Sequence, residues 1–340
     1  MNTTVAASYK HNAPAGIATS QEISDDIWDI YTFNKHKHKH KHKTNTVTDE
    51  YIALLKARNS DPMSSFGDFI AINGTVNRDM ARYLKNQVSD GIIAQNYTPE
   101  ALKILNKKKK GNYIVLKGNP STWEQDSVEF RELYGMALMQ PKNTLEIPKN
   151  IIDIKCTHER DDAILGTLAL KYIPSNSVTF TKDGHVVGIG CGQQNRLDCI
   201  RLAGQKALIW QMRQNPEVQK LVNSFLPTIS STEKINAIIK YIRGDFFPEE
   251  LLHFKNLFEE DTKIVPFKKE EQYSNLKDFS QFTMSSDGFL PFEDNIYEAV
   301  RYNVGQVIQP GGSIRDSQID EVCKKYGILS LKTNERIFTH

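Results

Sequence analysis

Apolar residues recur at three- and four-residue spacing in several segments of the chain, which is the period of an amphipathic helix. This spacing predicts helices over 49–58, 77–87, 161–172, 196–212, 232–242, 248–259 and 295–302. A further helix begins at Thr98, because Thr is a favourable N-cap and Pro99 suits the first helical position. Lys107–Lys110 is then the basic end of that helix, with a phosphate-binding patch as the alternative.

Strand-forming runs alternate with these helices. Ser177–Lys182 and His185–Gly190 flank Asp183-Gly184, and two β-rich runs about an Asp-Gly pair predict a hairpin. Residues 112–117 form another expected strand. Helices mixed with an antiparallel hairpin indicate a layered α/β architecture. No internal repeat is evident from the sequence alone.

Size and composition narrow the class of protein. The 340 residues predict two packed units, and 39% apolar with 25% charged residues is typical of a globular protein. A net charge of +2 gives no global field that demands nucleic acid, and no apolar run is long enough to span a bilayer. The first residues do not resemble a secretory signal. The cysteines at 156, 191, 199 and 323 form no C-x-x-C pair, so we expect reduced thiols in a cytosolic protein.

Lysine and histidine alternate from Lys35 to Lys43. Period-two alternation could place four imidazoles on one face of a strand, where they could bind a metal. The lysines between them repel an incoming cation, however, and no carboxylate interrupts the tract. A solvated insertion in a loop is therefore the simpler interpretation.

Two short motifs carry candidate chemistry. Gly188–Arg196 follows an expected strand and precedes an expected helix, as a phosphate-binding loop does, but its G-x-G-x-G spacing differs from the dinucleotide fingerprint. It is either a tight corner or a binding loop that uses Gln193, Gln194 and Arg196. Lys10-His11 could supply a base and an electrostatic stabiliser for acyl transfer. The polar clusters 64–69, 175–177 and 285–289, taken singly, suit turns or caps.

Taken together, these segments resemble one family: the transformylase domain of the bifunctional purine-biosynthesis enzyme. The matching segments keep one order along nearly the whole chain: Lys10–Gly16, Met63–Phe69, Val88–Ala94, Ser175–Val178, Gly188–Arg196, Arg201–Gly204, Ser285–Phe292, Pro310–Arg315 and Arg336–His340. One such match would be weak. Eight or more in the same order are highly specific.

The resemblance implies an α/β fold of two cytidine-deaminase-like three-layer α/β/α units, over 1–148 (with the Lys/His insertion at 35–43) and 149–340. The implied enzyme is a phosphoribosylaminoimidazolecarboxamide formyltransferase of purine biosynthesis. It would transfer a formyl group from 10-formyltetrahydrofolate to the 5-amino group of aminoimidazole carboxamide ribonucleotide (AICAR). The implied form is a cytosolic homodimer that binds these small molecules, not nucleic acid or membrane. His-x-Glu with Pro-Cys-x-x-Cys is missing, so zinc deamination is not implied.

The resemblance also assigns roles to individual residues. His11 would be the base, Lys10 an electrostatic stabiliser and Asn176 a donor to the formyl oxygen. The implied ligand contacts are Phe66, Gly67, Asp90, Phe289, Arg336 and His340 for the nucleotide, Arg196, Leu197 and Asp294 for the folate, and Ser175, Ser177 and Asp287 for a potassium ion.

The chain departs from the family pattern in places. We expect no counterpart before Lys10 of the family's Arg-Tyr-Gly segment, which holds the substrate phosphate, and no cyclohydrolase domain. The terminal His-His is Thr339-His340, and Phe-Phe is Phe289-Leu290. A rival hypothesis is therefore a catalytically weakened remnant that binds nucleotide or folate, or that pairs with a longer subunit. A dinucleotide oxidoreductase rests on the glycine corner alone.

Overall fold

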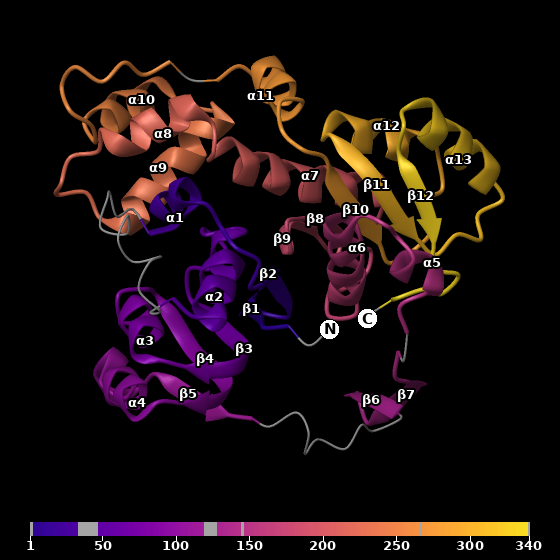
Figure 1. Cartoon of the computed structure of the whole chain (residues 1–340), viewed down its shortest axis with the longest axis horizontal. Coiled ribbons are helices and arrows are strands. Elements are labelled where there is room, and N and C mark those ends of the chain that lie inside the picture. Colours follow the sequence, from indigo (N-terminus) through magenta and orange to yellow (C-terminus); the bar gives the residue numbers. More distant parts are fainter. Residues whose placement is uncertain (1–2, 33–46, 119–127, 144–145, 266, 339–340) are drawn as a thin grey trace.

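A computed structural model of the chain describes residues 3–32, 47–118, 128–143, 146–265 and 267–338. Its centre is a ten-stranded mixed sheet in the order β12-β11-β10-β8-β9-β2-β1-β3-β4-β5. Helices flank this sheet in layers (Figure 1). The α/β fold class predicted from the sequence is confirmed.

The sheet consists of two halves with the same arrangement of five strands. The first half holds β1 (Val5–Lys10), β2 (Ala13–Thr19), β3 (Asp68–Val76), β4 (Ser89–Tyr97) and β5 (Ile114–Lys117). The second holds β8 (Val178–Lys182), β9 (His185–Gly190), β10 (Phe282–Ser286), β11 (Val304–Gln309) and β12 (Leu329–Lys332). In each half the first three strands pair antiparallel and the last three parallel. The topology therefore repeats, although the sequence shows no repeat.

One antiparallel pairing joins the two halves. Ile17 in β2 pairs with Val186 in β9, and Ala18 pairs with His185. The ten strands therefore form one continuous sheet. The boundary between 148 and 149 stays a prediction, although α5 (Lys149–Ile152) begins there.

Helices cover the sheet on both faces of the second half. Leu165 and Ala169 of α6 (Thr157–Leu170) pack against Val186, whereas α7 (Arg196–Met212) packs with Phe180 and Val187 in the largest core cluster. α12 (Asp294–Arg301) and α13 (Asp316–Lys325) link the parallel strands of this half. In the first half, the corresponding elements are α2 (Asp49–Asn59), α3 (Arg78–Lys85) and α4 (Pro99–Leu105), and α1 (Asp25–Thr32) packs beside α2.

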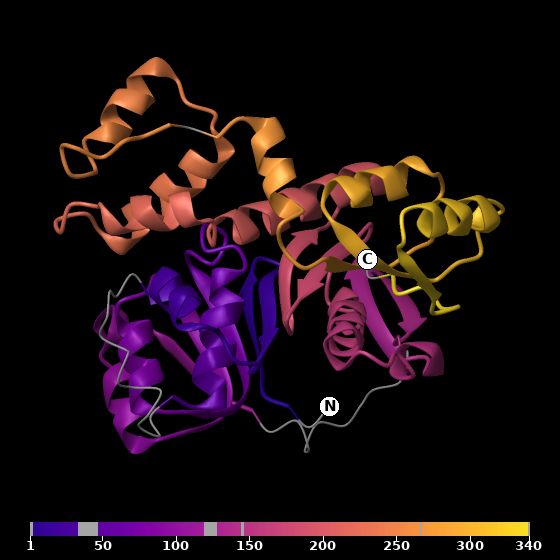
Figure 2. The same cartoon turned by 45° about the horizontal axis from the view of Figure 1, so that its top comes forward.

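Four helices extend the second half beyond the end of α7: α8 (Pro216–Asn223), α9 (Ser231–Arg243), α10 (Pro248–Lys255) and α11 (Lys269–Leu276). Figure 2 shows this group lying over the first half, and Figure 1 labels α9 close to α1. Ser230 and Glu233 form a capping box at the start of α9, and Gly244 ends it in the left-handed conformation. A separate two-stranded hairpin, β6 (Val128–Leu133) with β7 (Met136–Pro141), lies between the halves in sequence.

Local signals in the sequence were mostly reliable. Thr98 accepts a hydrogen bond from the backbone N–H of Ala101 and Pro99 begins α4, as predicted. Asp183 and Gly184 have φ of 52° and 64°, which is the turn that the predicted hairpin requires. The predicted end of α4 was wrong. Lys107–Lys110 were expected to close this helix, but it stops at Leu105, and 108–111 form a separate 3₁₀ turn, η1.

All four cysteines are free, as expected. Burial raises the pKa of the Cys199 thiol to about 12, so this thiol stays protonated, and it donates to the carbonyl oxygen of Asn176 at 3.1 Å. In the part of the chain that the structure describes, no helix is long and apolar enough to cross a membrane.

Candidate functional site

The Lys10-His11 pair lies at the turn between β1 and β2. Lys10 is the last residue of β1, and its Nζ donates a hydrogen bond of 2.8 Å to the carbonyl oxygen of Phe66. His11 has a φ of 58° and an exposed side chain. A left-handed conformation is uncommon for a residue with a side chain, and it is enriched for histidine. The turn therefore presents the imidazole to solvent beside a held ammonium group.

The segment around Phe66 and Gly67 faces this turn. Gly67 has a φ of 81° and its N–H donates to the carbonyl oxygen of Val88 at 2.9 Å. Space around Gly67 is open, so its conformation and not crowding is what favours glycine here. Asp90 follows at the start of β4 and forms an ion pair with Lys109. The structure thus brings five sequence-predicted residues, Lys10, His11, Phe66, Gly67 and Asp90, to one end of the first half; we call them group one.

Lys109 is a member of this region that the sequence analysis missed. It was assigned to a helix end, but α4 ends earlier, and Lys109 has a φ of 49° within η1. This backbone turns the side chain toward Asp90, whose carboxylate its Nζ contacts. Lys108 instead donates to the carbonyl oxygen of Gln87 and lies 4.9 Å from the ring centre of Tyr113. Within this run, Lys108 is therefore a packed residue, whereas Lys109 is a cation beside group one.

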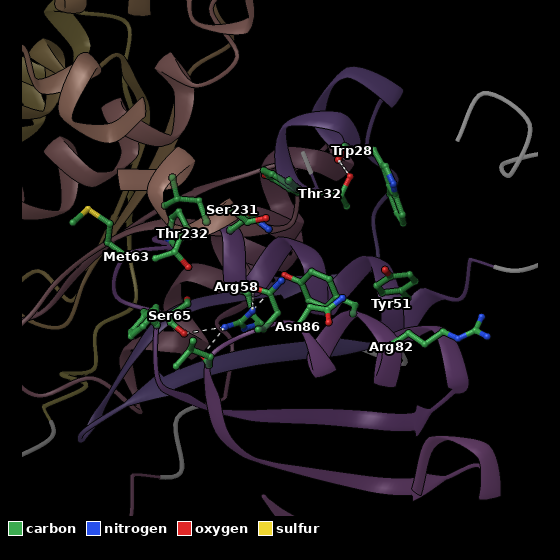
Figure 3. Close-up of a pocket in the computed structure, with 18 of the residues that line it drawn as sticks. Trp28, Thr32, Tyr51, Arg58, Met63, Ser65, Arg82, Asn86, Ser231 and Thr232 are labelled. Carbon is green, nitrogen blue, oxygen red and sulfur yellow. Dashed lines mark hydrogen bonds between the residues drawn. The ribbon is translucent and has the colours of Figure 1, made fainter. Parts of the chain in front are cut away.

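A cavity of about 710 Å³ adjoins group one. It lies between the helices α1, α2 and α3 of the first half and α9, and Phe66 of group one forms part of its wall together with Met63 and Ser65. Figure 3 shows Arg58 between Ser65 and Asn86, with Ser231 and Thr232 of α9 near Met63. Aromatic rings and amides make up much of the rest of its lining: Trp28, Tyr31, Tyr51, Tyr83, Asn59, Asn86, Gln87 and Asn236. Its size and its mixture of aromatic and hydrogen-bonding groups suit a small-molecule ligand.

A second set of predicted residues gathers where β8 begins and β10 ends. Arg196, the first residue of α7, donates to the side-chain oxygen of Asn176 and to the carbonyl oxygen of Ser177, both at 2.8 Å. Its guanidinium also forms a buried ion pair with Asp287. Asn176 in turn donates to the carbonyl oxygen of Gln193 at 2.8 Å. Arg196 therefore fixes the orientation of Asn176; we call this cluster, with Ser175, Ser177 and Asp287, group two.

The residues predicted to hold potassium provide oxygen donors. Ser175 donates to Asp287, and the Ser177 hydroxyl is buried without a hydrogen-bond partner. Hydroxyl and carboxylate oxygens are the ligands that hard cations prefer, and an unpartnered hydroxyl is available for one. That Ser175, Ser177 and Asp287 hold a potassium ion stays a prediction. Among the described residues, no group of three or more His, Cys, Asp or Glu side chains could hold a metal.

Two aromatic contacts surround a further predicted residue. The Arg336 guanidinium lies 5.6 Å from the ring centre of Phe289 and 5.8 Å from that of Phe338. The Asp287 carbonyl accepts a hydrogen bond from Ile337 N–H, which keeps Arg336 and Phe289 beside group two. Leu197 follows Arg196 in α7, and Asp294 begins α12, where it accepts a hydrogen bond from Asn295. His340 and the Lys35–Lys43 tract lie outside the described residues.

The glycine corner serves the packing of α7. A Cβ on Gly188 would lie 2.1 Å from the carbonyl oxygen of Ala203, and one on Gly190 would lie 2.1 Å from that of Cys199. The glycines are therefore needed for the close approach of β9 to α7. This favours the tight corner over a phosphate-binding loop, although Arg196 from the same segment does belong to group two.

Groups one and two lie along the same edge of the sheet, with the ends of β2 and β9 between them. In the described part of the chain, no hydrogen bond or ion pair joins a residue of one group to a residue of the other. The lining of the cavity includes Phe66 of group one and no member of group two.

The fold and these two polar groups define a two-part α/β protein with a ligand cavity beside a Lys-His turn. The chain belongs to the AICARFT/IMPCHase bienzyme family, whose sequence model matches residues 1–206. It is also 25% identical, over 342 aligned positions, to a protein of Aquifex aeolicus (strain VF5) described as "Bifunctional purine biosynthesis protein PurH". That alignment covers 100% of this chain and 48% of the relative, so the chain spans about half of the relative's length.

Proposed function

We propose that this chain transfers a formyl group from 10-formyltetrahydrofolate to the 5-amino group of AICAR, in purine biosynthesis in the cytosol. The observation that carries the proposal is the placement of Lys10 and His11 together at a turn, beside Phe66, Gly67 and Asp90. Membership of the bienzyme family supports it. The activity would be that of a phosphoribosylaminoimidazolecarboxamide formyltransferase.

The chemistry follows from the residues of group one. The acceptor amine is a poor nucleophile because its lone pair is delocalised into the ring and the carboxamide. His11, exposed at the turn, would take a proton as the nitrogen attacks the formyl carbon. Lys10 would stabilise the oxyanion of the tetrahedral intermediate, with Asn176 as a second donor. The bond from the formyl carbon to the folate nitrogen then breaks, and the proton passes to that nitrogen.

The positive charges suit an anionic nucleotide. Asp90 could accept hydrogen bonds from the sugar or base, while Lys109 beside it could attract the phosphate. Arg336, which lies against two aromatic rings, supplies a further cation beside group two. Lys109 and Arg336 therefore offer charge-assisted contacts for the substrate.

We place the folate donor in the cavity beside Phe66. A formyl carbon must lie within reach of Lys10 and His11, and this cavity shares the Phe66 wall with them. Its aromatic and amide lining suits a flat heterocycle that carries hydrogen-bonding groups. Arg196 of group two, with Leu197 and Asp294, would contact another part of the same molecule.

A homodimer would bring the two groups together. Within one chain no hydrogen bond or ion pair between described residues joins the two groups, and we propose that group one of one copy meets group two of the other. In the experiment, two inactive variants, His11→Ala and Asn176→Ala, are mixed in the unfolded state and refolded together. Random pairing would make half of the dimers hybrids with one intact site each, which restores about a quarter of the wild-type activity. No recovery would contradict the shared site.

The activity itself is tested by formyl transfer from 10-formyltetrahydrofolate to AICAR, followed by absorbance of the released tetrahydrofolate, with the purified chain. Nucleotide concentration is varied over several decades, because weak binding would raise KM and spare kcat. A folded protein without activity at any concentration would contradict the transferase. Ligand binding without turnover would favour the remnant hypothesis.

A further inference from the structure

Arg58 is a buried arginine at the end of α2 that no role in the proposed chemistry uses. Its side chain is 5% exposed, and its partner Asp68 is fully buried. The guanidinium meets the carboxylate with two nitrogens, Nε at 2.8 Å and Nη2 at 3.2 Å. This forked contact fixes the plane of the guanidinium.

The same guanidinium closes the base of the turn that carries Phe66. Nη2 donates to the carbonyl oxygen of Ser65 at 3.0 Å and to that of Val88 at 3.3 Å. The Val88 carbonyl also accepts the Gly67 N–H. Arg58 therefore contacts the backbone of Ser65, which precedes Phe66. It also contacts Val88, whose carbonyl binds Gly67, the residue that follows Phe66.

A second link runs to the strand that ends in Lys10. The hydroxyl of Ser8 in β1 donates to Asp68 Oδ2 at 2.8 Å and lies 2.9 Å from the Ser65 hydroxyl. Ser8 is two residues from Lys10, whose Nζ is bonded to the Phe66 carbonyl. The Arg58–Asp68 pair thus supports both ends of the Lys10–Phe66 contact.

The other edge of the guanidinium faces the cavity. Nη1 donates to Gln87 Oε1 at 3.0 Å and to the Tyr83 hydroxyl at 3.4 Å, and both residues line the cavity with Arg58 itself. Figure 3 shows Arg58 in this wall, with dashed hydrogen bonds toward Ser65. One planar group therefore lies between the cavity and the turn that holds Lys10.

We propose that Arg58 is a positioning residue of this site: it sets the Ser65–Gly67 turn, and through it Lys10, relative to the occupant of the cavity. Arg58 touches neither Lys10 nor His11, so it acts through the turn. The proposal rests on the proposed function. Lysine cannot replace it, because a single ammonium group cannot reach the carboxylate, two carbonyls and Gln87 in one plane.

The test compares Arg58→Lys with Arg213→Lys. Arg213 is a suitable control because it is 4% exposed and donates to the Asn59 carbonyl at 2.8 Å and the Asn59 side chain at 2.9 Å, at the same end of α2. Each variant loses a buried two-nitrogen contact of a guanidinium group, but only Arg58→Lys loses the hydrogen bonds to the Ser65–Gly67 turn. Assays are run well below the melting temperature of the less stable variant.

We expect Arg58→Lys to lower kcat by about 10- to 100-fold while the two KM values change less than about threefold, since misplaced groups are felt in the transition state. Acylation of Lys10 by a soluble active ester, measured by peptide mass spectrometry, should rise several-fold in this variant. Arg213→Lys should leave the labelling of Lys10 unchanged, and labelling is the readout that this control tests, because Arg213 also contacts Tyr31 and Asn59 of the cavity wall. Equal effects in both variants, or no effect in Arg58→Lys, would show a purely structural role.

The labelling measurement separates this proposal from the proposed function. If the wild-type chain transfers no formyl group, the function fails, and Lys10 reactivity still decides the role of Arg58. Should Arg58→Lys lack a cooperative thermal transition, Gln87→Met replaces it, because it removes one of the two acceptors of Nη1 and leaves the contacts of Arg58 with Asp68 and Ser65 in place. A kcat loss of about threefold or more is then expected, and an unchanged kcat with unchanged Lys10 labelling overturns the proposal.

Discussion

His185 Nε2 lies 2.7 Å from the hydroxyl of Ser60, at a fully buried position where the two halves of the sheet meet. Ser60 follows α2 in the first half, and His185 begins β9 in the second. Lys56 of α2 adds a second link, because its Nζ donates to the Asp183 carbonyl at 2.7 Å. The first half is therefore joined to the second through polar contacts as well as through the β2–β9 pairing.

This contact predicts a loss of stability in acid. Burial, followed by the nearby charge of Lys56, lowers the pKa of His185 well below its ordinary 6.5. Below about pH 6.5, His185 binds a proton in the unfolded chain but stays neutral in the folded protein. The free energy of unfolding therefore falls as the pH drops through that value. The measurement is thermal unfolding of wild type and His185→Gln at pH 7.5 and 5.0.

The wild type should lose more of its melting temperature over this range than His185→Gln, whose side chain does not titrate. His253→Gln is the control, because this histidine lies in α10, away from the junction. It should follow the wild type. Parallel pH profiles for wild type and His185→Gln would contradict the prediction.

Replacing His11 should affect turnover more than binding. His11→Ala removes the proposed base and leaves Lys10 bonded to Phe66, so kcat should fall by about 10²- to 10⁴-fold while KM for AICAR changes little. His158→Ala, which alters an exposed histidine in α6, should keep full activity. Steady-state kinetics with both substrates varied decides the matter, and an active His11→Ala enzyme would remove the imidazole from the mechanism.

Lys109 should contribute to nucleotide binding. Lys109→Met removes the cation beside Asp90, and the loss of one charge-assisted contact to a phosphate should raise KM for AICAR about tenfold with little change in kcat. Lys110→Met is a matched control, because this lysine is also exposed and left-handed within η1. Equal KM values for the two variants would show that the lysines act only through general charge, and added salt would then reduce both effects alike.

The sequence carried the local structure and the fragments of the site, but not their assembly. Thr98-Pro99 and Asp183-Gly184 are residue pairs whose own conformational preferences favour a helix start and a tight turn. The start of α4 and the β8–β9 turn could therefore be predicted. The pairing of Ile17 with Val186 joins positions far apart in the chain, and no local pattern specifies it. The repeated strand order stayed hidden for the same reason.

The same limit applies to the site. Lys10-His11 was visible as a motif, and the family resemblance added its partners. Lys109 was misread because a basic run after a helix fits a helix end equally well, and only its φ of 49° directs it to Asp90. Arg58 carries no sequence signal at all, since its role depends on the carbonyl oxygens of Ser65 and Val88.

The glycine corner offers a last prediction, on stability. Gly190→Ala adds a Cβ that would lie 2.1 Å from the Cys199 carbonyl, so β9 and α7 must separate, at a cost of about 1–3 kcal/mol or more. Gly192→Ala is the contrast: its surroundings are open and only its φ of 65° is unfavourable, which costs about 1 kcal/mol. Denaturant unfolding of both variants measures the difference. If the corner instead bound phosphate, Gly190→Ala would keep its stability and lose nucleotide affinity, whereas a less stable protein with unchanged affinity per folded molecule supports the packing role.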